Sequence, residues 1–250
     1  MKKLLVTSLL GLSSLIALAS CGNQDNGNTT DNSTTSSPTT STTAKEGYQV
    51  SVQYEDGTGL ADVRLQFCDE DGCYSQFVTT DANGVAVQDN ESILAKTTDL
   101  IIHINKGLPE GYTYDMNGTT VSKSNTSAVL TLHPLVTTDH VAGTREEPAK
   151  LTSLGYYKTC LAKDSITWIS FTISEAGTYE VETYDDILSP SDTAINISST
   201  STESVYNNDG GKGKNAKATF EGVAGVTYTI AIQQQGTSTE EDLTFSILKK

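Results

Sequence analysis

The side chains in this sequence that could do chemistry are few, and its four cysteines come first. Cys68 and Cys73 bound the acidic stretch Cys68-Asp-Glu-Asp-Gly-Cys73. If its two sides pair as antiparallel strands, opposed residues come within disulfide range. We expect a Cys68–Cys73 disulfide in preference to free thiols. A metal site ranks below both, because no further Cys or His lies at ligand spacing.

No set of catalytic residues accompanies the cysteines. The histidines are His103, His133 and His140, and His103 lies inside an apolar strand pattern. Neither H-E-x-x-H, nor Gly-x-Ser-x-Gly, nor a Gly-Lys-Ser/Thr phosphate loop occurs. The sequence assigns no histidine to Cys160 as a base, so we expect no thiol nucleophile and no enzyme.

Hard oxygen ligands gather at two places in the C-terminal half. Asp192, Asn208 and Asp209 carry carboxylate and amide oxygens of the kind that Ca²⁺ prefers. Asn and Asp also favour tight turns by bonding to their own backbone, which is the alternative interpretation. No EF-hand spacing is present. A calcium site here is a hypothesis, and no other cofactor is expected.

The excess of acidic over basic residues limits the kinds of molecule that the protein can bind. The chain has 250 residues, with 16 Lys and Arg against 31 Asp and Glu, and a net charge of −15. Nucleic acid is excluded as a partner because its phosphates require Lys and Arg. Electrostatic docking on anionic lipid is excluded for the same reason. An acidic surface suits cationic partners or divalent ions, but we favour a well-solvated extracellular surface.

The elements that would position these groups begin with an N-terminal targeting segment. Lys2 and Lys3 precede an apolar stretch over residues 4–18, shorter than the roughly 20 residues of a membrane span. The following Leu18-Ala19-Ser20-Cys21 resembles the lipobox of bacterial lipoproteins. The resemblance implies a signal peptide over residues 1–20 and a diacylglyceryl group on Cys21. The alternative is a plain secretory signal.

A lipid on Cys21 would place the protein at the bacterial cell membrane, facing outside the cytoplasm, because two acyl chains suffice for stable anchoring. The residues after it, 22–45, are Asn, Asp, Gly, Ser and Thr with almost no apolar side chain. Such a composition cannot offset the entropy of ordering the backbone. We expect residues 21–45 to be the lipidated cysteine and a disordered linker.

Residues 46–136 have the pattern of a first β domain. Apolar side chains alternate with polar ones from Tyr48, which is typical of strands with one buried face. Expected strands cover residues 48–54, 63–67, 74–79, 85–87, 100–104 and 128–133. Short strands with regular turns and no convincing helix predict an antiparallel sandwich.

Three motifs in this region resemble the transthyretin-like superfamily, which includes carboxypeptidase regulatory-like domains. They are Gly-Leu-Ala-Asp-Val-Arg-Leu over 59–65, Thr-Thr-Asp-Ala-Asn-Gly-Val-Ala over 79–86 and Leu-Pro-Glu-Gly-Tyr over 108–112. The resemblance implies a stalk, spacer or binding module. Some adhesin relatives carry a Lys–Asn isopeptide bond. The first strand here has no Lys, so we expect none.

Residues 137–250 repeat the alternating pattern. Expected strands include residues 169–173, 179–183, 195–197, 216–220, 228–232 and 243–247. About 110 residues of this kind predict a jelly-roll-like β-sandwich. The fold class expected for the whole protein is therefore all-β, with two β-sandwich domains, transthyretin/Ig-like and then jelly-roll-like.

The second domain resembles bacterial pre-peptidase C-terminal domains. Its motifs are Trp-Ile-Ser-Phe-Thr over 168–172, Ala-Gly-Thr-Tyr-Glu-Val over 176–181, Asp-Thr-Ala-Ile over 192–195, Asn-Asn-Asp-Gly over 207–210 and Ala-Gly-Val-Thr-Tyr over 224–228. The resemblance implies a module of secreted proteases and surface proteins. Residues 46–136 leave no room for a protease.

We expect an extracellular lipoprotein with non-catalytic binding or adhesion modules, held to the membrane by its lipid. A glycan or matrix protein is the expected ligand. Tyr156, Tyr157, Tyr184 and Tyr206 would stack on sugar rings if exposed, or belong to the core if not. The alternatives are a structural stalk or accessory subunit of an envelope complex and, last, a small hydrolase.

Overall fold

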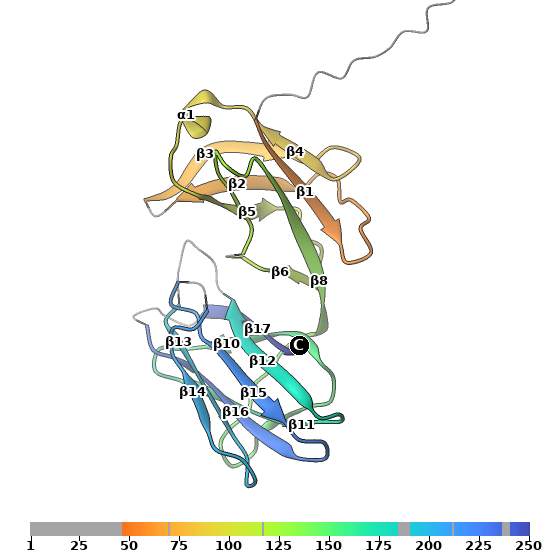
Figure 1. Ribbon diagram of the computed structural model, residues 1–250, viewed down its shortest axis with the longest axis vertical. Coiled ribbons are helices and arrows are strands. Elements are labelled where there is room, and N and C mark those ends of the chain that lie inside the picture. The colour runs from red at the N-terminus through yellow and green to blue at the C-terminus, as the bar shows by residue number, and fades with distance from the viewer. Residues whose placement is uncertain (1–46, 70, 117, 185–190, 212, 237–240) are drawn as a thin grey trace, which may run out of the picture. The chain divides into compact units, whose positions relative to one another are not determined.

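The computed structural model describes residues 47–250, except 70, 117, 185–190, 212 and 237–240, and those residues are almost entirely β (Figure 1). The all-β class is confirmed. The described residues fall within one compact unit. The predicted signal peptide, Cys21 and the linker lie outside the described residues. Within the described part, no helix is long and apolar enough to cross a membrane.

The N-terminal half packs two strand layers around one core. One sheet has the order β3-β2-β5-β7, and β1 pairs with β4 and β8 in the other layer, where β6 also joins β8. The elements are β1 (Tyr48–Tyr54), β2 (Arg64–Asp69), β3 (Gly72–Thr79), β4 (Val85–Gln88), α1 (Glu91–Leu94), β5 (Leu100–Lys106), β6 (Tyr112–Tyr114), β7 (Thr120–Val121) and β8 (Ser127–His140). Alternating side chains such as Val50 and Val52 are fully buried between the layers.

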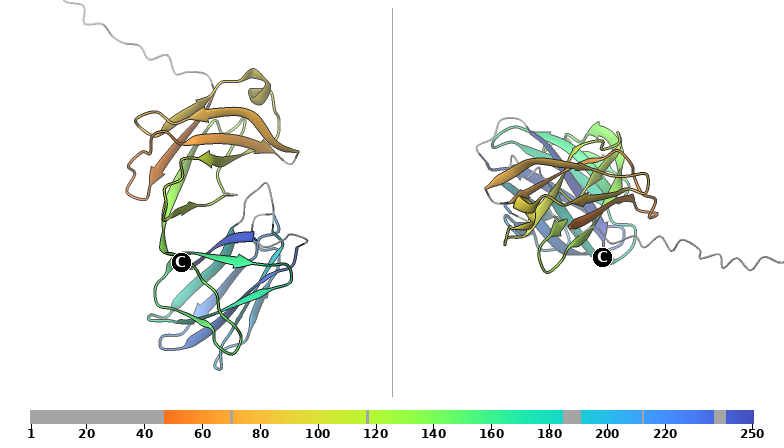
Figure 2. Two further views of the ribbon diagram at one scale, coloured as in Figure 1. Left: turned by 180° about the vertical axis from the view of Figure 1, so that it is seen from behind. Right: turned by 90° about the horizontal axis from the view of Figure 1, so that it is seen from above.

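The C-terminal half is a second two-layer sandwich with its own core. One sheet has the order β14-β13-β16-β11-β9, and the facing layer has β15-β12-β17-β10. The strands are β9 (Ala149–Leu151), β10 (Gly155–Leu161), β11 (Ile166–Thr172), β12 (Gly177–Tyr184), β13 (Thr193–Ser198), β14 (Val205–Asn207), β15 (Lys217–Gly222), β16 (Thr227–Gln234) and β17 (Glu241–Lys249). Figure 2 shows these strand layers from behind and from above.

Strand β8 crosses the predicted domain boundary at residues 136 and 137. It runs parallel to β1 in the first core and parallel to β10 in the second. Strand β9 is also parallel to β11. The expectation of a purely antiparallel first sandwich is therefore wrong at the β1–β8 pair. Alternation fixes which face is buried and leaves the strand direction open.

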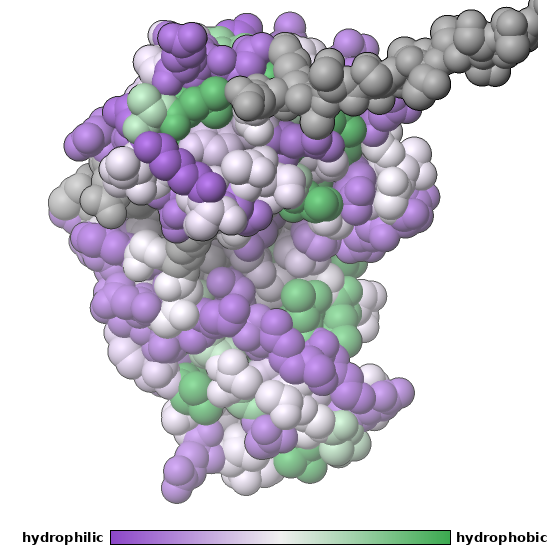
Figure 3. All heavy atoms as spheres, turned by 45° about the horizontal axis from the view of Figure 1, so that its top comes forward, coloured by the Kyte–Doolittle hydropathy of each residue, from purple (hydrophilic) through white to green (hydrophobic). Residues whose placement is uncertain are grey.

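The surface agrees with the composition. The face in Figure 3 is mainly hydrophilic, with hydrophobic side chains in small separate patches. This is the surface expected of a chain with a net charge of −15.

Candidate functional site

The outer face of the second sandwich carries a row of four side chains across four neighbouring strands. Trp168 of β11 lies opposite Ala231 of β16, Ala231 opposite Asn196 of β13, and Asn196 opposite Tyr206 of β14. Figure 1 shows these strands side by side. With three steps of about 4.8 Å between strands, the two aromatic residues stand on backbones about 14 Å apart.

A second row lies beside the first. Gln233 of β16 is opposite both Ile166 of β11 and Ala194 of β13. The two alanines lack bulk, so the sheet is hollowed between the larger side chains. The hollow has a volume of about 120 Å³ and is lined by Ile166, Trp168, Ala194, Asn196, Tyr206, Ala231 and Gln233. We call it the aromatic trough.

The aromatic trough combines exposed apolar area with amide groups. Tyr206 is 59% exposed and Ile166 is 39% exposed. The alternate residues of the same strands, such as Ile195 and Ile232, are fully buried and fix the orientation of the face. The guanidinium of Arg145 lies 5.7 Å from the centre of the Trp168 ring. Such a surface can stack on a flat ligand and hydrogen-bond its edge.

The other predicted aromatic contacts are not part of this face. Tyr157 is 1% exposed and Tyr184 is 7% exposed, so both belong to the core. Tyr156 is half-buried and stacks on His133, with ring centroids 4.3 Å apart. Burial raises the pKa of Tyr156 to about 12. Of the four tyrosines considered from the sequence, Tyr206 is the one presented to solvent.

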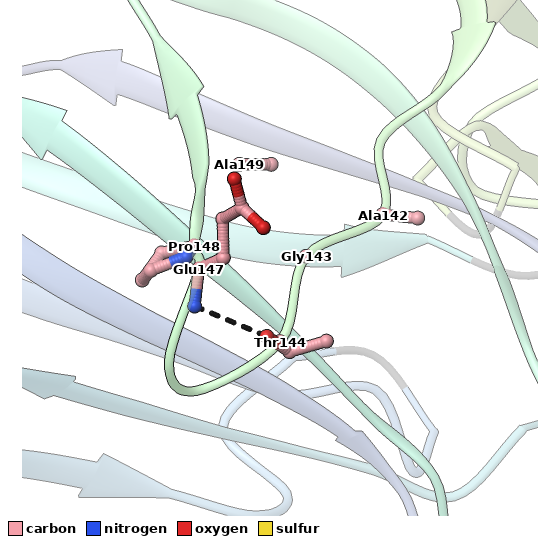
Figure 4. Close-up of a pocket in the computed structure, with 6 residues that line it drawn as sticks. All are labelled: Ala142, Gly143, Thr144, Glu147, Pro148 and Ala149. Atoms are coloured by element: carbon pink, nitrogen blue, oxygen red, sulfur yellow. Dashed lines mark hydrogen bonds between the residues drawn. The ribbon is translucent and has the colours of Figure 1, made fainter.

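A larger hollow lies in the turn before β9. It is lined by Ala142, Gly143, Thr144, Glu147, Pro148 and Ala149 (Figure 4). The Glu147 amide donates to Thr144 Oγ1 at 3.0 Å, and this hydrogen bond connects the two ends of the turn. Figure 4 shows a single carboxylate there, without a neighbouring base or nucleophile among the residues drawn.

The structure places the histidines with partners on separate strands. His103 is 8% exposed, and its Nδ1 lies 3.2 Å from Tyr114 Oη, as befits a structural strand residue. His133 Nδ1 lies 2.8 Å from Glu55 Oε1. These two histidines therefore have structural contacts in the first sandwich.

The third histidine contacts the register partner of the remaining cysteine. His140 Nε2 lies 3.0 Å from Asp242 Oδ1, and Asp242 is the register partner of Cys160 on β10. No sequence motif links His140 to Cys160, because this neighbourhood depends on strand order. Both members of the ion pair are largely exposed, at 45% and 67%. Asp242 holds the His140 imidazole in this ion pair, and a thiol becomes a nucleophile only where a neighbouring cation or base lowers its pKa.

Cys68 and Cys73 are joined in a disulfide across the β2–β3 hairpin. Beside it, the Tyr74 hydroxyl donates to the Asp69 carboxylate. This hydrogen bond, opposed by burial and helped by Lys96 at 3.8 Å, holds the pKa of Asp69 below its usual range. The disulfide and this hydrogen bond both stabilise the β2–β3 hairpin of the first sandwich.

The predicted calcium ligands lie where the loops after β14 and before β13 meet. Asp192 Oδ2 lies 3.3 Å from Lys214 Nζ, and Asn208 Nδ2 lies 3.5 Å from Asp209 Oδ2. In the part of the chain that the structure describes, no group of three or more His, Cys, Asp or Glu side chains could hold a metal ion. Any site here would need amide oxygens as well.

Comparison with known proteins gives distant structural likeness only. No family model matches the chain, and no curated protein matches it. The pre-peptidase C-terminal domain of a Bacillus anthracis collagenase is 11% identical, covering 44% of this chain and 97% of its own, at a TM-score of 0.34. BcpA, the major pilin subunit of Bacillus cereus, is 14% identical. The match covers 82% of this chain and 66% of the pilin chain, at a TM-score of 0.26. Likeness at this level carries no argument about function.

Proposed function

We propose that this protein is a membrane-anchored extracellular lipoprotein whose C-terminal sandwich is a non-catalytic glycan-binding module. The observation that carries the proposal is the aromatic trough, where Trp168 and Tyr206 stand at the ends of a row with Asn196 between them. Sugar rings offer flat apolar faces and hydroxyl edges, which aromatic rings and amides complement.

The small volume of the trough favours an extended ligand over a small enclosed one. Its volume is about 120 Å³, below the roughly 300–1,000 Å³ typical of drug-sized pockets. A chain of sugars laid across the strands would contact both aromatic residues at once. The amides of Asn196 and Gln233 would then fix its orientation by hydrogen bonds.

Binding to a glycan array, followed by calorimetry on the strongest hit, tests the module with the chain from residue 22. We expect Tyr206→Ala and Trp168→Ala each to weaken binding at least tenfold. Phe77→Ala is the matched control, because Phe77 is a partly exposed aromatic residue of β3 outside the trough. Binding to matrix proteins but to no glycan would overturn the glycan assignment and favour an adhesin. Binding to neither glycans nor matrix proteins would also overturn it and favour a stalk.

Anchoring through Cys21 is tested separately. The supporting observation is the sequence Leu18-Ala19-Ser20-Cys21 after an apolar stretch. A palmitate analogue should label the full chain in a bacterial host and should not label Cys21→Ala. Equal labelling of both would contradict the anchor. A thiol-directed activity probe that labels Cys160 in the native protein, and fails with His140→Ala, would instead revive the hydrolase alternative.

A further inference from the structure

Among the described residues of the second sandwich, three buried side-chain oxygen atoms lack a hydrogen-bond partner. They are Asp192 Oδ1, Asn208 Oδ1 and Asn215 Oδ1. Asn215 is 4% exposed, so this side chain has almost no access to solvent. A buried acceptor without a donor destabilises a fold, so native structures provide a partner for nearly all such atoms. All three atoms here are acceptors, and what they need is a donor or a cation.

The backbone brings these three residues to the same pair of loops. The Thr193 amide donates to the Lys214 carbonyl at 3.1 Å, and the Ala216 amide donates to Thr193 Oγ1 at 3.0 Å. Asp192 and Asn215 are the immediate chain neighbours of these bonded groups. The two residues therefore lie alongside each other at the start of β13.

The Asn208 side of the loop folds back onto Asn215. Asn207 Oδ1 accepts from the amides of Gly210 at 2.6 Å and Lys217 at 3.2 Å. The Gly211 amide donates to the Asn215 carbonyl at 2.8 Å. These bonds hold the start of the loop, which contains Asn208, against its end.

Glycine is needed where this loop packs on Asn215. A Cβ at Gly211 would lie 2.7 Å from the Asn215 carbonyl oxygen and 3.1 Å from Asn215 Cβ. The backbone at Gly211 therefore packs directly on the main chain and Cβ of Asn215. Asn215 is thus covered by the loop, and its side-chain oxygen is buried without a hydrogen-bond partner.

We propose that these oxygens bind one Ca²⁺ ion, with Asp192, Asn208 and Asn215 as side-chain ligands. Carboxylate and amide oxygens are hard donors, and Ca²⁺ accepts six to eight oxygen ligands in irregular geometry. Asp209, next to Asn208, adds a second negative charge to the loop. Waters complete the coordination, since three protein ligands leave positions open. The site adds to the proposed glycan binding and does not depend on it.

Lys214 contacts the outer oxygen of the Asp192 carboxylate. Its ammonium group contacts Asp192 Oδ2 and is largely exposed, with 65% of the side chain accessible. Asp192 Oδ1 faces inward and keeps no partner. The lysine thus offsets the charge of Asp192 from the outside and leaves the buried oxygen available to the cation.

The test uses the full chain, stripped with a chelator and titrated with CaCl₂ by calorimetry, with thermal unfolding in calcium and in chelator. We expect one Ca²⁺ per chain and a higher Tm in calcium, with equal MgCl₂ giving a smaller shift. Asp192→Asn, of the same shape, and Asn208→Ala should each weaken binding at least tenfold. Glu203→Gln, an exposed carboxylate between β13 and β14, is the matched control and should bind as the wild type does.

Asn215→Ala tests the buried ligand directly. If that variant does not fold, the two more exposed variants still decide the matter. Equal Tm values in calcium and in chelator, without binding heat, would overturn the proposal and leave the three oxygens to water. Binding that survives both Asp192→Asn and Asn208→Ala would place any calcium elsewhere and overturn it as well.

Discussion

Lys214 Nζ lies 3.3 Å from Asp192 Oδ2, so a largely exposed ammonium group contacts one oxygen of a carboxylate whose other oxygen is buried and has no partner. A positive charge at this distance opposes a divalent ion on the same carboxylate by Coulomb repulsion. We therefore expect Lys214→Met to bind Ca²⁺ severalfold more tightly than the wild type. Calorimetry at fixed ionic strength measures the change. Weaker binding would mean that the lysine helps to build the site.

Tyr206 should contribute to ligand binding and little to folding. At 59% exposure, its replacement by alanine should change the free energy of unfolding by less than about 0.5 kcal/mol. Tyr228 on β16 is the contrast, since it is 1% exposed and its ring centre lies 4.8 Å from that of Phe220. Tyr228→Ala should cost about 3–5 kcal/mol. Urea unfolding of both variants tests this, and equal costs would show that Tyr206 is structural.

The Cys68–Cys73 disulfide closes a short loop, so its contribution should be modest. On the chain-entropy estimate for six residues, replacing both cysteines with serine should cost about 2 kcal/mol. Urea unfolding of the double variant measures this, and the wild type in a reducing agent serves as the control. An unchanged urea midpoint would mean that the disulfide contributes nothing to the stability of the fold.

Asp69 predicts a pH dependence of stability. Its pKa is lower in the folded chain than in the unfolded one, chiefly because the Tyr74 hydroxyl donates to its carboxylate. The resulting stabilisation is fully present above the unfolded pKa of about 4. It is lost as the pH falls through the lower folded value.

The corresponding experiment compares unfolding free energies at pH 7 and pH 3. Asp69→Asn should lose less stability over this range than the wild type does. Asp99→Asn is the control, because Asp99 is exposed just before β5. If the free energy of unfolding falls by the same amount in Asp69→Asn and in the wild type, the hydrogen bond from Tyr74 does not favour the ionised form of Asp69.

The sequence predicted those parts of the fold that depend on local alternation. Strands around Val50 and Ile230 show period two over several residues, and both side chains are fully buried in the structure. Strands β7 and β14 have two and three residues, too few to show a period, and were missed. The parallel pairing of β1 with β8 was missed because direction depends on the connection between strands.

In the candidate sites too, the sequence indicates single residues but not their arrangement in space. Tyr206 was noticed as an aromatic residue, but its row with Asn196 and Trp168 depends on register across four strands. Asn215 gave no signal, because a single asparagine between lysine and alanine resembles any loop residue. Its burial is visible only once Thr193 and Gly211 are placed around it.

Strand β14 is only three residues long, and it places Tyr206 one residue from Asn207 and two from Asn208. The aromatic trough and the proposed calcium ligand Asn208 are thus joined by a single short edge strand. Any energetic coupling between them must be reciprocal: the factor by which Ca²⁺ changes the affinity for a glycan equals the factor by which the glycan changes the affinity for Ca²⁺. If both proposed sites exist and are coupled through β14, the affinity for glycan would change with the calcium concentration.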